Sequence, residues 1–140
     1  MLRTIDKPLY TAKTHTEGGR DGRGRTSDGY LDVMLTSPAL GRPGTNPEQL
    51  LGIGCSACFM GAMRRAGSDL GIRVPQGVEI DAEVTLGNTA DMGFALAMKM
   101  TVHIPSLSPE DKQRLVDGAH ARCPYSLATR GNIDVHFVIP

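Results

Sequence analysis

The stretch TNPEQLLGIGCSACFMGAMRRAGSDLG, residues 45–71, decides the fold that we expect for this chain. Asn46 is a favourable N-cap, Pro47 suits the first helical position, and Glu48 complements the positive end of a helix dipole. The positions that follow, as far as Arg64, are nearly all apolar or small, which is typical of a helix buried on all sides. The stretch therefore predicts a central, buried helix.

Alternating apolar and polar residues predict strands on both sides of this helix. A second, amphipathic helix is predicted by Ser108 as N-cap and Pro109 at the first position. The expected elements in chain order are strands within residues 1–16 and 31–37, the buried helix, an antiparallel strand pair within 77–87 and 92–105, the second helix within 106–123, and a strand within 132–140.

This order, β-β-α-β-β-α-β, predicts an α+β fold with antiparallel sheets around buried central helices. One twisted sheet and one short amphipathic helix can hardly cover the first helix on every side. A homodimer that sandwiches two such helices between two sheets would cover them, so we expect a dimer.

Length and composition narrow the class of protein. A chain of 140 residues has the usual size of one domain, here residues 1–140. A net charge of zero and only 4% aromatic residues argue against a nucleic-acid binder. No apolar run is long enough to span a membrane, and the N-terminus lacks the apolar segment of a signal peptide. An odd number of cysteines then favours reduced thiols in the cytoplasm.

The three cysteines allow several kinds of site. Cys55-x-x-Cys58 with His120-x-x-Cys123 could form a Cys₃His zinc set, but both pairs fall within predicted helices, where no tight turn supplies a knuckle. A thioredoxin-like couple belongs at a helix N-terminus, whereas about two helical turns precede Cys55. We therefore expect neither a metal site nor this redox couple, and we interpret Cys55 as core packing.

Cys58 needs electrostatic help if it is to act as a nucleophile. An apolar setting raises the pKa of a thiol, and a nearby cation is the usual remedy. The glycine-rich loop at 17–30 offers three arginines, Arg20, Arg23 and Arg25, without indicating which one serves. An arginine in such a site needs a carboxylate to orient it, and Glu48 is available.

Five motifs resemble those of one known family. GGRDGR (18–23), GTNPEQLL (44–51), CSACF (55–59), AHARCPYS (119–126) and ATRGNIDV (128–135) occur in the order found in organic hydroperoxide resistance (Ohr) proteins of the Ohr/OsmC family. The resemblance extends over nearly the whole chain. Cys55 departs from it, because many relatives carry an aromatic residue there.

The resemblance implies a thiol-dependent peroxidase that reduces organic hydroperoxides, including those of fatty acids, to alcohols. It implies that Cys58 is the peroxidatic cysteine and Cys123 the resolving one, that Arg20 stabilises the thiolate and the developing oxyanion, and that Glu48 orients Arg20. It further implies an intertwined homodimer with no bound cofactor or metal, recycled by an external dithiol, the dihydrolipoyl group of a lipoylated protein.

Helix geometry restricts how Glu48 reaches the thiol. Residues 48 and 58 on one straight helix are about 15 Å apart along its axis, which is too far for both to contact one guanidinium easily. Either the helix breaks near Gly52 or Gly54, or Glu48 and Arg20 act on Cys58 of the partner subunit, which we prefer. Two other functions stay open: a lipophilic-ligand-binding module without enzymatic activity and a general thiol-disulfide reductase.

Overall fold

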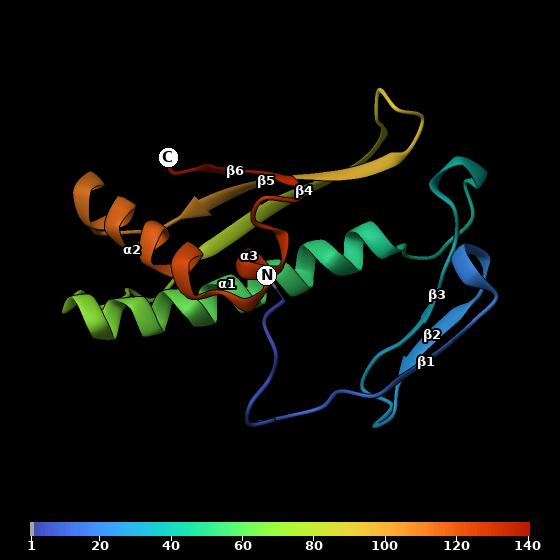
Figure 1. Cartoon of the computed structure of the whole chain (residues 1–140), viewed down its shortest axis with the longest axis horizontal. Helices are drawn as coiled ribbons and strands as arrows, with labels where there is room; N and C mark the ends of the chain where they lie inside the picture. Colours follow the sequence, from blue (N-terminus) through green and yellow to red (C-terminus); the bar gives the residue numbers. More distant parts are fainter. Residues whose placement is uncertain (1) are drawn as a thin grey trace. The chain divides into compact units, whose positions relative to one another are not determined.

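The computed structural model describes residues 2–140. They form two compact units, residues 2–47 and Glu48–Pro140 (Figure 1). The α+β class and the predicted order of elements are confirmed. The structure adds a short strand within the glycine-rich loop and a short helix after residue 123. That the two units make up a single domain stays a prediction.

The first unit holds a three-stranded antiparallel sheet in the order β1-β2-β3. Its strands are β1 (Thr14–Glu17), β2 (Arg23–Thr26) and β3 (Asp32–Met34). Two 3-10 turns complete the unit, η1 (Gly19–Asp21) and η2 (Pro38–Leu40). The strand expected within residues 1–16 therefore begins only at Thr14, and residue 1 lies outside the described residues.

The turn between β1 and β2 depends on two glycines that have no Cβ atom. Gly18 has φ +75°, a conformation that favours glycine, and a Cβ at Gly22 would lie 1.7 Å from the carbonyl oxygen of Glu17. The chain can therefore reverse tightly around η1, and the residues beyond the turn are free to pair as β2. We had expected only a loop over this stretch.

The second unit is built on α1 (Pro47–Leu70), one uninterrupted helix of 24 residues. It begins at the predicted proline and continues one and a half turns beyond the predicted apolar run. One face of α1 is buried, through Gly52, Cys55, Phe59, Met63, Ala66 and Gly67. The opposite face is exposed in the single chain, where Ile53 is 70% exposed.

A mixed sheet in the order β4-β5-β6 covers the buried face of α1 (Figure 1). The predicted pair β4 (Glu79–Asn88) and β5 (Phe94–His103) is antiparallel, with Ala82 opposite Met100. β6 (Asp134–Val138) instead runs parallel to β5, so this sheet is not purely antiparallel as we had expected. A long helical crossover returns the chain in the same direction, as parallel pairing requires.

The crossover consists of α2 (Pro109–Arg122) and α3 (Pro124–Thr129). Ser108 caps α2 as predicted, accepting a hydrogen bond from the amide of Asp111 at 3.2 Å. α2 packs closely on α1, since a Cβ at Gly118 would lie 2.8 Å from the Cβ of Ala66. The core between helices and sheet includes Phe59, Met100, Val102, Leu115, Val116 and Cys123.

Candidate active site

The four residues predicted for the site lie on three different features of the chain. Cys58 is in the middle of α1, and Glu48 is in the first turn of the same helix. Cys123 lies where α2 ends and α3 begins. Arg20 lies in η1, within the first unit. The structure brings Cys58 and Cys123 together within the second unit.

The Cys58–Cys123 pair is held by well-defined backbone structure. The Cys123 thiol donates a hydrogen bond to the Cys58 sulfur, with the two Sγ atoms 3.5 Å apart. Cys123 closes α2 through its amide, which donates to the Ala119 carbonyl at 2.8 Å, while its own carbonyl accepts from the Leu127 amide at 2.9 Å. The position of the Cys123 sulfur is thus fixed by both helices at their junction.

The two thiols differ in access to solvent. Cys123 is 1% exposed, whereas Cys58 is half-buried. A reagent can therefore reach the Cys58 sulfur before it reaches Cys123. This asymmetry suits a pair in which one thiol reacts first with an external molecule and the second acts only on the product.

The second unit by itself disfavours the Cys58 thiolate. Burial raises the pKa of Cys58, and so does its hydrogen bond with the Cys123 thiol. The backbone amide of Tyr125, in the first turn of α3, has the opposite effect and lowers the pKa of Cys58. The sequence indicated the effect of the apolar setting, and the structure adds that the amide alone does not overcome it.

Cys55 is a buried third thiol beside this pair. It is 2% exposed, and burial raises its pKa to about 11, with smaller contributions from Cys123 and Cys58. Its burial confirms the interpretation of this residue as core packing. Because α1 is regular from Pro47 onward, Cys55 does not lie at a helix N-terminus, as a thioredoxin-like couple would require.

No metal site forms around these cysteines. Among residues 2–140, no group of three or more histidine, cysteine or acidic side chains is arranged to hold a metal ion. His120 packs edge-on against Phe137, with the ring centroids 4.9 Å apart. The Cys₃His set that the spacing allowed is therefore not assembled. Over the same residues, no helix has the length and apolar character to cross a membrane.

Two of the three candidate arginines, Arg23 and Arg20, have different surroundings. Arg23 is held by Asp32 of the neighbouring strand through two hydrogen bonds, at 2.7 and 2.5 Å. This pairing raises the pKa of Arg23 and lowers that of Asp32. Arg23 is therefore paired within its own sheet. Arg20 lies in η1, in the turn between β1 and β2.

The continuity of α1 removes one of the two explanations for how Glu48 could reach a thiol. The helix does not break at Gly52 or Gly54. A Cβ at Gly52 would instead contact the side chains of Val84 and Ala82, and one at Gly54 would lie 3.3 Å from the Tyr125 hydroxyl. These glycines therefore provide close packing against β4 and α3, and Glu48 remains about 15 Å along the axis from the Cys58 of its own helix.

Sequence reasoning missed the part that Tyr125 plays. Its amide acts on Cys58, and its hydroxyl fits against Gly54, so one residue contacts α1 at two points. The signal was present in CPYS (123–126), because a proline after the cysteine predicts a helix start with free amides nearby.

Comparison with known proteins agrees with this geometry. Residues 40–138 match the family model of the OsmC-like proteins. An organic hydroperoxide resistance protein of Xanthomonas axonopodis pv. citri is 43% identical over 138 residues, covering 96% of each chain. The organic hydroperoxide resistance protein OhrB of Bacillus subtilis is 42% identical over 131 residues, covering 91% of this chain and 95% of its own.

The likeness extends to the fold. The crystal structure of OhrB of Bacillus subtilis superposes with a TM-score of 0.88, at 40% identity over the aligned residues, covering 95% of this chain and all of that one. The resemblance seen in the five sequence motifs is therefore confirmed. This chain belongs to the OsmC-like family, in its organic hydroperoxide resistance (Ohr) branch.

Proposed function

We propose that this protein is a cysteine-based peroxidase that reduces organic hydroperoxides, including those of fatty acids, to alcohols. The observation that carries the proposal is the half-buried Cys58 with the buried Cys123 sulfur 3.5 Å from it. Relatives covering almost the whole chain are named organic hydroperoxide resistance proteins, which supports the same reaction class.

The proposed reaction needs only the two thiols and an external reductant. The Cys58 thiolate attacks the distal oxygen of the hydroperoxide, the O–O bond breaks, and the alcohol leaves after taking up a proton. Cys58 is thereby oxidised to a sulfenic acid. The Cys123 thiol then attacks this sulfur, water leaves, and a Cys58–Cys123 disulfide forms. A dithiol reduces the disulfide by exchange and is itself oxidised. No bound metal or flavin takes part.

Arg20 and Glu48 complete the proposed site. Because the surroundings of Cys58 in the second unit raise its pKa, a cation is needed to favour the thiolate. We assign this role to Arg20, which would also stabilise the negative charge that develops on the leaving oxygen. Glu48 orients the guanidinium. Since α1 is unbroken, we assign Glu48 and Arg20 to Cys58 of the partner subunit.

The exposed side of α1 supports the homodimer that we propose. Ile53 and Ala57 are exposed on this side, and nothing lies within 4 Å of a Cβ built at Gly61. These residues are spaced by four positions, so they form one stripe on which a second helix can pack closely. Ile53→Glu should dissociate the dimer in sedimentation velocity and lower peroxidase activity with it, whereas Ser68→Glu, farther along α1, should do neither.

We propose that the reductant is the dihydrolipoyl group of a lipoylated protein. We also propose that the protein acts in the cytoplasm. The decisive assay is steady-state turnover of tert-butyl hydroperoxide against hydrogen peroxide, with a lipoyl dithiol and then with thioredoxin. Preferred use of the organic substrate with the lipoyl dithiol supports the proposal. Turnover of protein disulfides without peroxide would instead identify a general thiol-disulfide reductase.

Matched variants test the residue roles. Cys58→Ser should abolish peroxidase activity with the fold intact, and retained activity would refute the assignment. Arg20→Gln should raise the pKa of Cys58, measured from the pH dependence of iodoacetamide alkylation. Arg25→Gln, in β2 of the same unit, is the control and should leave that profile unchanged. Equal profiles for both variants and the wild type would remove Arg20 from the site.

A further inference from the structure

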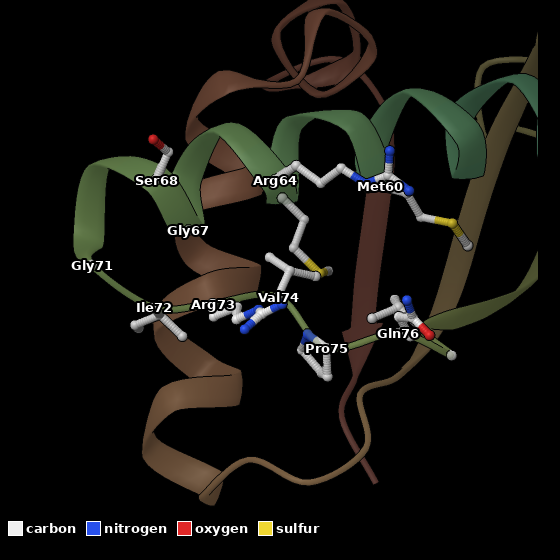
Figure 2. Close-up of a pocket in the computed structure, with 13 residues that line it drawn as sticks. Met60, Arg64, Gly67, Ser68, Gly71, Ile72, Arg73, Val74, Pro75 and Gln76 are labelled. Carbon is white, nitrogen blue, oxygen red and sulfur yellow. The ribbon is translucent and has the colours of Figure 1, made fainter.

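Three glycines of α1 make room for other parts of the second unit. Glycine destabilises a helix relative to alanine, so each of these positions is expected to serve a close contact. A Cβ at Gly67 would lie 2.5 Å from the Ile72 carbonyl oxygen, on the segment that follows α1 (Figure 2). A Cβ at Gly52 would lie 3.4 Å from the side chain of Val84 in β4. Both contacts hold the framework of the fold, whereas the third, at Gly54, involves a residue that also contacts Cys58.

That residue is Tyr125, which meets α1 at two points one helical turn apart. A Cβ at Gly54 would lie 3.3 Å from the Tyr125 hydroxyl and 3.7 Å from the ring carbon Cζ that carries it. The backbone amide of Tyr125 interacts with Cys58. Gly54 and Cys58 are four positions apart, so they lie on the same side of α1 and about 6 Å apart along its axis. The Tyr125 side chain therefore extends along one turn of α1, from Cys58 to Gly54.

The helix that carries Tyr125 is short and mostly exposed. α3 has six residues, fewer than an isolated helix needs to be stable, and within Pro124–Thr129 only Ser126 is buried. The Thr129 hydroxyl donates a hydrogen bond to the Tyr125 carbonyl at 3.0 Å, which ties the Tyr125 backbone to the end of α3. The contact between Tyr125 and Gly54 therefore contributes strongly to the distance between α3 and α1.

This distance affects two properties of the cysteine pair. Cys123 precedes Tyr125 by two residues, and its sulfur lies 3.5 Å from that of Cys58, whereas a disulfide requires about 2 Å. The Tyr125 amide favours the Cys58 thiolate and lowers the pKa of Cys58. A displacement of the Tyr125 ring away from α1 would move both the amide and the Cys123 sulfur away from Cys58.

We propose that Tyr125 is a positioning residue for the Cys58–Cys123 pair. Its ring fits where Gly54 has no Cβ, and it holds the α2–α3 junction at the distance from α1 at which the Tyr125 amide and the Cys123 sulfur both reach Cys58. This inference rests on the proposed function in that it takes the two cysteines to be the reactive pair. All of the contacts lie within the second unit of one chain, so none requires a surface that the proposed partner subunit would cover.

Gly54→Ala tests this role without changing Tyr125 or a cysteine. At 3.3 Å the added methyl group is closer to the hydroxyl than an ordinary van der Waals contact, so the ring must shift by a few tenths of an ångström. The midpoint of the pH profile for iodoacetamide alkylation of Cys58 should rise. Alkylation at pH 7 should become about threefold slower, because part of one hydrogen bond to the thiolate is lost. The rate is measured on the peptide that contains Cys58 by mass spectrometry, since Cys55 and Cys123 are also thiols.

Gly52→Ala is the matched control, because it adds the same methyl group to the same helix, 3.4 Å from Val84 of β4. It should leave the alkylation profile of Cys58 unchanged. Tyr125→Phe removes the hydroxyl and leaves Cζ, 3.7 Å from the added methyl group, as the nearest ring atom, which is an ordinary contact. Gly54→Ala should therefore have no effect on the profile when it is made in the Tyr125→Phe protein.

Tyr125→Ala is a second variant, which removes the ring and keeps the amide. It should raise the pKa of Cys58 at least as much as Gly54→Ala does, with the helix content retained in far-ultraviolet circular dichroism. An unchanged profile in Gly54→Ala, an equal shift in Gly52→Ala, or an equal effect of Gly54→Ala with tyrosine and with phenylalanine at position 125 would each overturn the proposal. The comparison of Gly54→Ala in these two backgrounds decides by itself if Tyr125→Ala does not fold.

The test is independent of the proposed peroxidase activity, because alkylation uses no peroxide. The expected shifts in a protein that does not turn over tert-butyl hydroperoxide would support the positioning role and refute the proposed function. Turnover by the wild type without the expected shift in Gly54→Ala would support the proposed function and refute the positioning role.

Discussion

Oxidation by one equivalent of tert-butyl hydroperoxide should stabilise this protein by an amount that identifies the disulfide formed. Cys58 and Cys123 are 65 positions apart in the chain, and their sulfur atoms already lie 3.5 Å from each other. Closing a loop of that length removes unfolded-state entropy equivalent to about 4 kcal/mol at 25 °C. The sulfurs need to approach to only about 2 Å, so little of this stabilisation is lost to strain.

The alternative bridge predicts a different magnitude. A Cys55–Cys58 disulfide closes a loop of only three positions, for which the same relation gives about 1.6 kcal/mol before any strain. With a urea m value of about 2 kcal/mol/M, the Cys58–Cys123 bridge shifts the unfolding midpoint by about 2 M and the short bridge by less than 1 M. The size of the shift therefore distinguishes the two pairings.

The assay is urea unfolding followed by far-ultraviolet circular dichroism, since the chain has no tryptophan. Reduced and oxidised samples are compared at one protein concentration, because association also changes apparent stability. The Cys55→Ser variant should show the full shift and Cys123→Ser none. A shift that persists in Cys123→Ser, or peptide mass spectrometry that finds Cys55 joined to Cys58, would refute the reasoning.

Two further predictions concern the helices and their titration. Gly118→Ala should lower the free energy of unfolding by roughly 1–2 kcal/mol, because overpacking against Ala66 at 2.8 Å outweighs the better helix propensity of alanine; a stabilised variant in urea would contradict this. Burial, and then the charge of Arg130, hold the pKa of His120 below its ordinary value of 6.5. Neutral His120 therefore contributes stability above pH 6.5, and this contribution is lost as the pH falls through the folded-state pKa. Stability should therefore fall less between pH 7 and 5 in His120→Gln than in the wild type, while the exposed-histidine control His136→Gln should fall as the wild type does.

Much of the fold could be predicted because its local signals agree with one another. Pro47 and Pro109 mark the first residues of α1 and α2, and the alternation in residues 77–105 gives the β4–β5 pair. The direction of β6 could not be predicted in this way. Alternation shows that a strand is half-buried but carries no information on the direction of its neighbour, which depends on the crossover through α2 and α3.

The candidate site was predictable in part for a similar reason. A motif identifies residue types, and so it indicated the apolar setting of Cys58, which the structure shows as burial and a raised pKa. The pairing of Arg23 with Asp32 depends on the register of β2 against β3. β2 was not predicted, because it lies within the glycine-rich stretch. The roles of Arg20, Glu48, Cys58 and Cys123 stay predictions for the experiments above.

The regular, unbroken α1 also determines where the symmetry axis of the proposed dimer passes. In a twofold dimer, if residue i contacts residue j of the second copy, then residue j contacts residue i of that copy. Along two antiparallel helices, the two residue numbers of each contacting pair therefore add up to the same total. A meeting of Glu48 with Cys58 of the partner subunit sets this sum and places the symmetry axis midway between the two positions, at Ile53. That residue is the 70% exposed side chain on the open side of α1. One helix without a kink would thus fix where the axis passes and hold both reactive centres at equal distances from it.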